Sequence, residues 1–492
     1  MENICEDKKI FLWLHMHQPC YEIPESKYLY LPWVRRHMLN GYYTIPKLLM
    51  ETGVKLNINF SGILLKQMKL YEKELAKDIF QLYEEKEANS LSEAEKNFII
   101  KKFLITLPIK SDRFSYLIEK KQKKESFSTS EILDTQVLFL LSAFAWPEEE
   151  VLEIGKKEEN FSENDKSLII NAQKRIVKSI IPMYKKLNDE NQIEITVSPY
   201  YHPILPLLID KNSAKESKED SILPDIEFAY PEDAEKQIDK SIEICKEIFG
   251  VIPKGLWPSE GSISNSTIDL IKNRGIEWIG TDELILRKTA ETLNKKPGVY
   301  KVRNLKVFFR DHQLSDKIAF TYNKMNPEDA VNDLLNNQNN EKENMKIIIL
   351  DGENPWIFYP QNGVPFLKEL FNELSKNNSL LGSKVQEKEK MNSIKPGSWI
   401  NGYFDTWIGD PETNKAWSYL GDAKKKLGKI EKSNDDILIA EGSDFFWWFS
   451  NFHRKEVDYS FDYMFRTRLA NAYKNGGKPI PDYLLYPIKM DD

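Results

Sequence analysis

The chain has 492 residues, of which 41% are hydrophobic and 29% are charged, and its formal net charge is −7. These values are ordinary for a globular protein and exclude a disordered or fibrous chain. The charge is mild and forms no basic stripe, so we expect no nucleic-acid and no membrane partner. The three cysteines show no metal-binding spacing, and no segment is long enough for a signal-peptide core, which favours a cytoplasmic protein.

Seven short runs share one arrangement, in which apolar residues come first and polar or ionisable residues follow. The runs are residues 10–18, 55–62, 193–202, 253–260, 276–283, 305–311 and 346–354. Near-continuous apolar runs are typical of strands that are buried on both faces of a parallel sheet. The polar ends of such strands meet at one rim, which is where barrel enzymes carry their active sites.

Helical patterns lie between several of these runs. Residues 231–250 begin with a proline, carry apolar residues at helical spacing and end at Gly250. Residues 264–275 repeat the arrangement, with Ser264 or Asn265 as the N-cap and Gly275 as the stop. Alternating strands and helices predict an α/β fold, and seven units indicate a TIM-like barrel that is one strand short of eight.

The composition also divides the chain into regions. We predict a barrel catalytic domain over residues 1–380, interrupted at about residues 66–190 by a mainly helical insertion rich in Lys and Glu. Residues 377–398 have the composition of a linker or loop. The Trp-rich residues 381–492 are predicted to form a helical C-terminal domain that contributes to the active site.

Two carboxylates follow different strands, Glu260 in "GLWPSEGS" and Asp351 in "LDGENPW". Hydrolysis of a glycosidic bond needs such a pair, because one group attacks or stabilises the anomeric carbon and the other protonates the leaving oxygen. Trp257 and Trp356 lie near one carboxylate each and are candidates for stacking on sugar rings. Turn chemistry is the alternative explanation for either carboxylate alone.

Histidines gather at the predicted strand ends. His15 and His17, in "HMHQP" with Gln18, point to the same face of a strand. His202 and His312 also lie on or just after strand ends, so four of the chain's six histidines share this position. One interpretation is a metal site completed by an aspartate, and the other is hydrogen bonding to substrate hydroxyls.

The C-terminal part is dense in aromatic residues, in "GSWINGYFDTWIGDPETNKAW" and "EGSDFFWWFSNFH". Asp405, Trp407, Asp444 and Trp448 combine hydrogen-bond acceptors with flat apolar surfaces, as carbohydrate recognition requires. Packing between helices is the alternative explanation for these aromatic side chains.

Five motifs in order resemble those of glycoside hydrolase family 57, a family of retaining enzymes that act on α-glucans. The motifs are "HMHQP", "TVSPYYHPILPLL", "GLWPSEGS", "LDGENPW" and "DTWIGDPETNKAW". The resemblance implies an incomplete (β/α)7 barrel followed by a helical region. It also implies that Glu260 is the nucleophile and Asp351 the general acid/base, although Glu353 shares a strand face with Asp351. No catalytic metal or cofactor is implied. By motif position the resemblance extends a substrate-binding role to His15, His17, His202, Trp257, Asp405 and Trp407.

The leading hypothesis is a retaining hydrolase of α-amylase type that acts on α-1,4-glucans or maltooligosaccharides. A 4-α-glucanotransferase is the near alternative, with branching or debranching activity behind it. A metal-dependent amidohydrolase or deacetylase is a rival from another class, using the histidines with Asp282 or Asp351. A catalytically silent glucan-binding protein is the third reading, and the sequence leaves the oligomeric state open.

Overall fold

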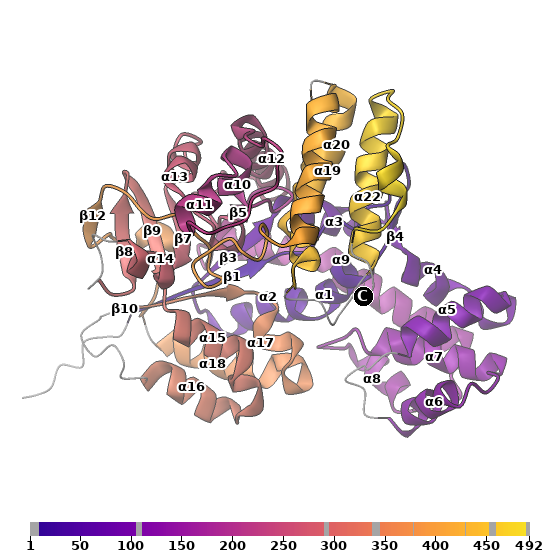
Figure 1. The fold of residues 1–492 in the computed structure, drawn as a ribbon. Coiled ribbons are helices and arrows are strands. Elements are labelled where there is room, and N and C mark those ends of the chain that lie inside the picture. The colour runs from indigo at the N-terminus through magenta and orange to yellow at the C-terminus, as the bar shows by residue number, and fades with distance from the viewer. Residues whose placement is uncertain are drawn as a thin grey trace, which may run out of the picture.

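Seven parallel strands form the centre of the molecule (Figure 1). The structure, a computed structural model, describes residues 9–104, 111–289, 295–336, 345–376, 378–428, 430–451 and 459–488. The seven are β1 (Lys9–Met16), β3 (Leu56–Ser61), β5 (Ile193–Ser198), β6 (Gly255–Leu256), β7 (Trp278–Asp282), β9 (Leu305–Arg310) and β10 (Met345–Asp351). Each falls within, or within one residue of, one of the seven predicted runs.

The strands follow one another around an incomplete barrel. Their order is β10, β1, β3, β5, β6, β7 and β9, and all neighbours in this series pair in parallel. Among the described residues no regular ladder joins β9 to β10. The gap is bridged instead by the Asp311 N–H, which donates to the carbonyl of Ile347 at 2.8 Å. The predicted incomplete (β/α)7 barrel is therefore confirmed.

Smaller strands extend the sheet at its margins. β8 (Gly298–Val302) forms an antiparallel hairpin with β9, and β12 (Glu389–Met391) pairs with β8. β11 (Asn378–Ser379) pairs with β1, while β2 (Tyr28–Leu29) and β4 (Lys77–Asp78) form a separate two-stranded sheet. The interpretation of residues 377–398 as a linker or loop is therefore wrong for β11 and β12, because their backbones join the sheet.

Helices surround the barrel on its outer side. Between β1 and β5 lie α1 (Trp33–Leu39), α2 (Gly41–Thr52), α3 (Gly62–Glu72), α4 (Ile79–Glu85), α5 (Glu93–Phe103), α6 (Asp112–Gln122), α7 (Thr129–Leu141), α8 (Glu149–Gly155) and α9 (Glu163–Asp189). Between β5 and β11 lie α10 (Leu205–Ile209), α11 (Ser213–Ser217), α12 (Pro231–Phe249), α13 (Asn265–Lys272), α14 (Glu283–Lys288), α15 (His312–Phe320), α16 (Pro327–Asn336), α17 (Asn354–Ile357) and α18 (Val364–Lys376). After β12 come α19 (Pro411–Leu427), α20 (Glu431–Ala440), α21 (Ser443–Phe449) and α22 (Tyr459–Asn475).

The sequence signals for α12 and α13 are confirmed. Helix α12 begins at Pro231, whose missing N–H costs nothing in a first turn, and ends at Gly250 in a left-handed conformation. Helix α13 is capped by Ser264, whose side chain accepts a hydrogen bond from the Thr267 N–H.

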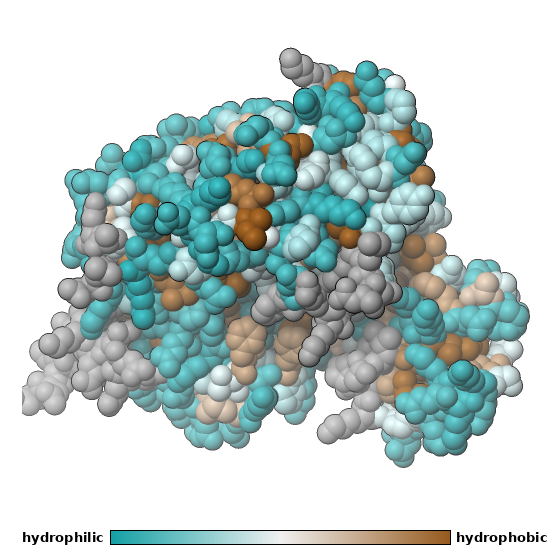
Figure 2. All heavy atoms as spheres, viewed as in Figure 1, coloured by the Kyte–Doolittle hydropathy of each residue, from teal (hydrophilic) through white to brown (hydrophobic). Residues whose placement is uncertain are grey.

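Two groups of helices lie outside the barrel layer. Figure 1 shows α4 to α8, in purple, as one group, and α19, α20 and α22, in orange to yellow, as another. The face seen in Figure 2 is mostly hydrophilic, with hydrophobic residues in scattered groups. Within the described residues no helix is long and apolar enough to cross a membrane, and the cysteines Cys20 and Cys245 are free and buried.

The barrel interior is filled by large side chains. Phe11, Trp13, Trp257, Trp278 and Phe308 belong to one buried cluster, and each is fully buried. Phe11 and Phe308 stack with ring centroids 4.2 Å apart. Because this cluster fills the interior, polar residues further along the same inward faces are left at the carboxyl-terminal rim.

Candidate active site

Strand alternation carries the chain from the apolar interior to a polar rim. On β1, Phe11 and Trp13 lie in the interior cluster, and His15 follows two residues later on the same face. The strand register places His15 opposite Asp351 of β10 on one side and Asn59 of β3 on the other. The parallel register therefore brings residues of three strands to one place.

Glu260 lies in a short 3-10 turn after β6 and has a left-handed backbone, with φ 58° and ψ 27°. Such a conformation costs a non-glycine residue about 1–3 kcal/mol and concentrates at functional sites. Oε2 of Glu260 accepts a hydrogen bond of 2.8 Å from the indole N–H of Trp399, and its backbone carbonyl accepts from the Trp399 N–H at 3.0 Å. Its Oε1 lies 3.8 Å from Nδ1 of His202. The carboxylate is thus held at a fixed position.

The two predicted catalytic carboxyls share one electrostatic environment. Burial, followed by the charge of Asp351, raises the pKa of Glu260 to about 8, although the bond from Trp399 lowers it. Burial also raises the pKa of Asp351 to about 6, while the charges of His17 and Arg310 act in the opposite direction. The pair therefore carries a single proton between about pH 6 and pH 8.

Glu353, the carboxylate that alternation placed beside Asp351, is a third acid at this site and is buried. It accepts a short hydrogen bond from the hydroxyl of Tyr42. Burial and the charge of Asp351 raise the pKa of Glu353 to about 8. Only 9% of this residue is exposed, and it is engaged with Tyr42, so Asp351 is the better placed of the two to meet a substrate.

His15 and His202 form a chain of neutral rings whose tautomers follow from their partners. The amide N–H of Asn59 donates to Thr196, so its oxygen accepts from Nδ1 of His15 at 2.6 Å. His15 Nε2 then accepts from Nε2 of His202 at 3.0 Å, and His202 Nδ1 accepts from the Ser443 hydroxyl at 3.0 Å. Burial, followed by the charge of His17, lowers the pKa of His15 to about 3, and burial likewise lowers that of His202.

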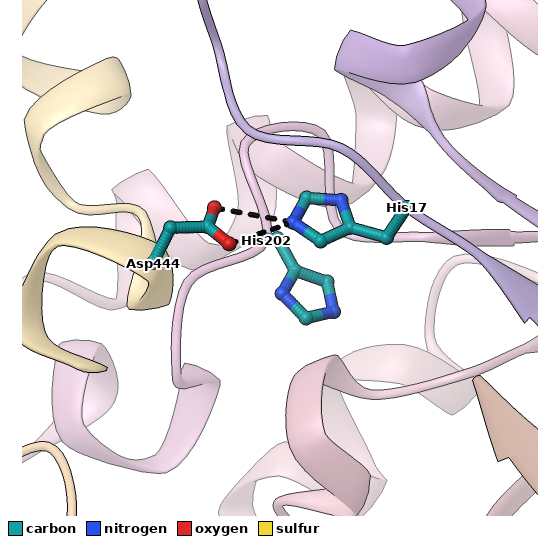
Figure 3. Close-up of side chains that lie close together, drawn as sticks. All are labelled: His17, His202 and Asp444. Atoms are coloured by element: carbon teal, nitrogen blue, oxygen red, sulfur yellow. Dashed lines mark hydrogen bonds and ion pairs between the residues drawn. The ribbon is translucent and has the colours of Figure 1, made fainter. Parts of the chain in front are cut away.

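His17, His202 and Asp444 converge at the rim, as Figure 3 shows. Their potential ligand atoms lie within 4.8 Å of one another, which suits a metal ion. However, Nε2 of His17 lies 3.0 and 3.1 Å from the two carboxylate oxygens of Asp444, and Nδ1 of His17 bonds to Ser61. Both nitrogens of His202 are also engaged. In the structure hydrogen bonds engage these ligand atoms, and a bound metal ion would replace those bonds.

Asp282, the alternative acid of the metal hypothesis, belongs to another cluster. Its Oδ2 accepts from Nε of Arg310 at 2.5 Å and from Nδ1 of His312 at 2.8 Å. Burial raises the pKa of Asp282, but the charge of Arg310 and the bond from His312 outweigh it and lower the pKa overall. Asp282 and His312 therefore do not join the three histidines.

The family model described as "Glycosyl hydrolase family 57" matches residues 11–401, which is most of the chain and includes both catalytic candidates. The chain belongs to glycosyl hydrolase family 57. The predictions of this family and of an enzyme of the glycoside hydrolase class are thereby confirmed.

Named relatives fit this membership at low identity. Over 242 residues the chain is 23% identical to "Alpha-amylase 1" of Dictyoglomus thermophilum, a match that covers 47% of this chain and 32% of that relative. A family 57 branching enzyme from Thermococcus kodakaraensis has a similar fold, with a TM-score of 0.59 and 15% identity over 96% of this chain and 90% of that one. The α-amylase AmyC of Thermotoga maritima gives a TM-score of 0.58 and 14% identity over 97% and 95%.

Three tryptophans that the sequence assigned to sugar binding are buried in this family 57 chain. Trp257 is 0% exposed inside the barrel, and Trp407 is 0% exposed beside Trp447. Trp356 is 3% exposed, and its indole N–H donates to the carbonyl of Gly352. Their ring faces are covered by protein, so the expectation that they stack on sugar rings is wrong for this conformation. Aromatic residues beside a site motif serve core packing equally well.

The other expected binding residues differ in whether they contact the histidine cluster. Asp444 joins the histidines, whereas Asp405 is exposed and forms an ion pair with Lys218 at 2.8 Å. Gln18 is half-buried next to His17 in the chain and accepts a hydrogen bond from the Tyr21 hydroxyl. Trp448 is half-buried and stacks on Phe461 with ring centroids 5.1 Å apart. Of these four, Asp444 is the one whose side chain bonds directly to a histidine of the cluster, His17.

Sequence reasoning missed five residues that hold the site together: Trp399, Arg310, Tyr42, Asn59 and Ser443. Arg310 lies at the polar end of the predicted run 305–311, and this position is a signal that could have identified it, whereas Asn59 lies inside the run 55–62. Ser443 precedes Asp444 in a noted motif. Tyr42 and Trp399 lie on a helix and in a loop, where no strand periodicity marks them.

Proposed function

We propose that the protein is a retaining α-glucan hydrolase of α-amylase type that acts on α-1,4-linked chains through a covalent intermediate on Glu260. The observation that carries the proposal is the pair Glu260 and Asp351, two half-buried carboxyls on different strand ends whose charges interact. Both positions fall within the family match. A retaining mechanism requires two such carboxyls.

In this proposal the Glu260 carboxylate attacks the anomeric carbon of the bound sugar with Oε1, since Oε2 is bonded to Trp399. Asp351 donates its proton to the departing glycosidic oxygen, so the C–O bond breaks as the glycosyl ester forms. Asp351 then removes a proton from water, the resulting hydroxide equivalent attacks the anomeric carbon, and Glu260 leaves as a carboxylate. Two inversions give net retention.

The histidine cluster supplies polar groups beside this reaction centre. His17 and Asp444 are half-buried, so they are open to hydroxyls of a sugar bound against Glu260. His15 and His202 are fully buried and neutral, which suits a supporting role. No step requires a metal ion, because the charges that develop meet carboxyls and hydrogen-bond donors.

The position of the single proton constrains this mechanism. Catalysis needs the proton on Asp351 and a charge on Glu260. Burial raises the pKa of both carboxyls, so the pair retains a proton near neutral pH. Contacts made by the bound sugar then favour the arrangement with the proton on Asp351, as is usual where substrate binding contributes to catalysis.

Transfer of the glycosyl group to a sugar hydroxyl is the alternative outcome of the same intermediate. Incubation of the protein with maltooligosaccharides distinguishes them, since hydrolysis gives only shorter products and transfer also gives longer ones. The Glu260→Gln variant should form neither. Activity that survives in Glu260→Gln and depends on stoichiometric zinc would contradict the proposal and favour a metal-dependent amidohydrolase.

A further inference from the structure

Arg310, at the end of β9, is fixed from several sides although it makes no bond to either catalytic carboxyl. Its Nε donates to Asp282, one terminal nitrogen donates to the carbonyl of Ile349 at 3.2 Å, and the other donates to Asp316 at 3.2 Å. Its side chain is only 6% exposed. A buried guanidinium with this many partners has one permitted orientation.

The guanidinium lies over the ring of Trp399, with its central carbon 4.8 Å from the ring centroid. Trp399 is 7% exposed and also packs against Trp257, at 5.1 Å between centroids. The indole N–H of Trp399 is the donor to Oε2 of Glu260. The chain of contacts therefore runs from the end of β9 through an aromatic ring to the predicted nucleophile.

We propose that Arg310 and Trp399 form a positioning pair, in which Arg310 orients the Trp399 ring and Trp399 holds Glu260 for attack. Arg310 also bonds to the carbonyl of Ile349, two residues before Asp351 on β10, and from there its charge acts on Asp351. The assignment of roles to Glu260 and Asp351 rests on the proposed function. The pairing of Arg310 with Trp399 rests on the contacts between the guanidinium, the indole ring and Glu260. The proposed roles require no contact with the sugar, so Arg310 and Trp399 are positioning residues.

The electrostatic surroundings of Arg310 and Trp399 agree with these two separate roles. Arg310 lowers the pKa of Asp351, and the Trp399 bond lowers that of Glu260, so each member of the pair favours the ionised form of one carboxyl. The titratable groups that face Arg310 are Asp282, Asp316, His312 and Asp351. Those that face Glu260 are Asp351, Asp444 and His202.

The test measures the two carboxyl pKa values directly and does not need turnover. The side chain of Glu260 is 18% exposed, so a carbodiimide with an amine nucleophile can reach it. Labelling of the protonated form, followed by peptide mass spectrometry from pH 4 to pH 10, gives a titration for Glu260 and one for Asp351. Trp399→Phe should raise the pKa of Glu260, and Arg310→Met should raise that of Asp351. Arg310→Lys should restore the Asp351 titration, because it keeps the charge.

Trp278→Phe is the matched control. Trp278 also belongs to the interior cluster, and its indole N–H also donates to a carboxylate, Glu194, at 2.9 Å. We expect this variant to leave the Glu260 titration unchanged. Unchanged titrations in Trp399→Phe and Arg310→Met, with native circular dichroism, would overturn the proposal. A Trp278→Phe shift as large as that of Trp399→Phe would do the same.

Kinetics provide the second readout. Loss of one charge-assisted hydrogen bond to a nucleophile should lower kcat of Trp399→Phe about ten- to hundredfold and leave KM nearly unchanged. A raised KM with unchanged kcat would show that Trp399 binds sugar and would contradict a positioning role. If the wild-type protein turns over no glucan, the proposed function fails, while the titrations still decide the pairing.

Discussion

Replacement of Asp351 by Asn tests the electrostatic coupling at the centre of this site. In the wild-type protein activity requires one proton on the pair Glu260 and Asp351. Activity should fall below about pH 6, where both carboxyls are protonated, and above about pH 8, where both are ionised. The profile of kcat/KM should therefore be bell-shaped, with its maximum near the midpoint. Asp351→Asn removes the ionisation of Asp351, and with it the negative charge that helps to raise the pKa of Glu260.

The expected size of the effect follows from the causes of the Glu260 shift. Its rise from 4.5 to about 8 corresponds to about 5 kcal/mol between the charged and neutral forms. Burial is the largest cause and the Asp351 charge is the second. In Asp351→Asn the burial contribution stays and the charge contribution vanishes, so the pKa of Glu260 should lie between 4.5 and 8.

An α-maltosyl fluoride is the suitable substrate, because fluoride departs without a proton from Asp351. With this substrate kcat/KM of Asp351→Asn should rise with pH through a single ionisation and then stay constant, since only an ionised Glu260 is needed. Glu260→Gln, measured in parallel, should be inactive at every pH. A second limb at high pH in Asp351→Asn, or an ionisation above pH 8, would refute the coupling.

Three further changes test the structure more widely. Glu260→Gln should have the same free energy of unfolding as the wild type near pH 4 and exceed it by up to about 5 kcal/mol above pH 8. The reason is that the raised pKa of Glu260 in the folded state lowers wild-type stability as pH rises from 4.5 to about 8. Thermal denaturation at both pH values checks this, and a difference between variant and wild type that is the same at both pH values would contradict it. Tyr42→Phe leaves the buried Glu353 without its hydroxyl donor, so urea denaturation should show a loss of about 1–3 kcal/mol. Arg35→Met removes the partner of the buried carboxylates Asp78 and Glu84 and should lower the free energy of unfolding by about 3–5 kcal/mol. In the control Lys178→Met, loss of the exposed ion pair with Glu74 should lower it by less than about 1 kcal/mol. Similar losses in both variants would contradict this reasoning.

Local sequence patterns were sufficient to predict the positions of the barrel strands and of several helices. Apolar runs with polar ends identified all seven strands of the barrel, because burial on both faces imposes a continuous apolar character. Pro231 and Gly250 marked the ends of α12, because each depends on the backbone of a few neighbouring residues. The motif around Glu260 likewise placed a carboxylate at a strand end, since the chain there is short and its position follows from β6.

Side-chain surroundings depended on contacts between distant parts of the chain. Trp257 and Trp356 had the same sequence signal as a sugar-stacking residue, yet the packing of the barrel interior and of α2 covers both. Trp399 meets Glu260 across 139 residues, and Asp444 meets His17 across 427. No local periodicity encodes such distances.

The sequence by itself determined which residue types reach the rim of the barrel, because strand alternation and apolar burial act over a few residues. Tertiary structure alone decided which of them are partners. In the folded chain Asp444 bonds to His17, Asp282 bonds to Arg310, and Trp399 bonds to Glu260. Hydrogen bonds and charge effects depend on distances of a few ångströms, and only the folded chain sets those distances.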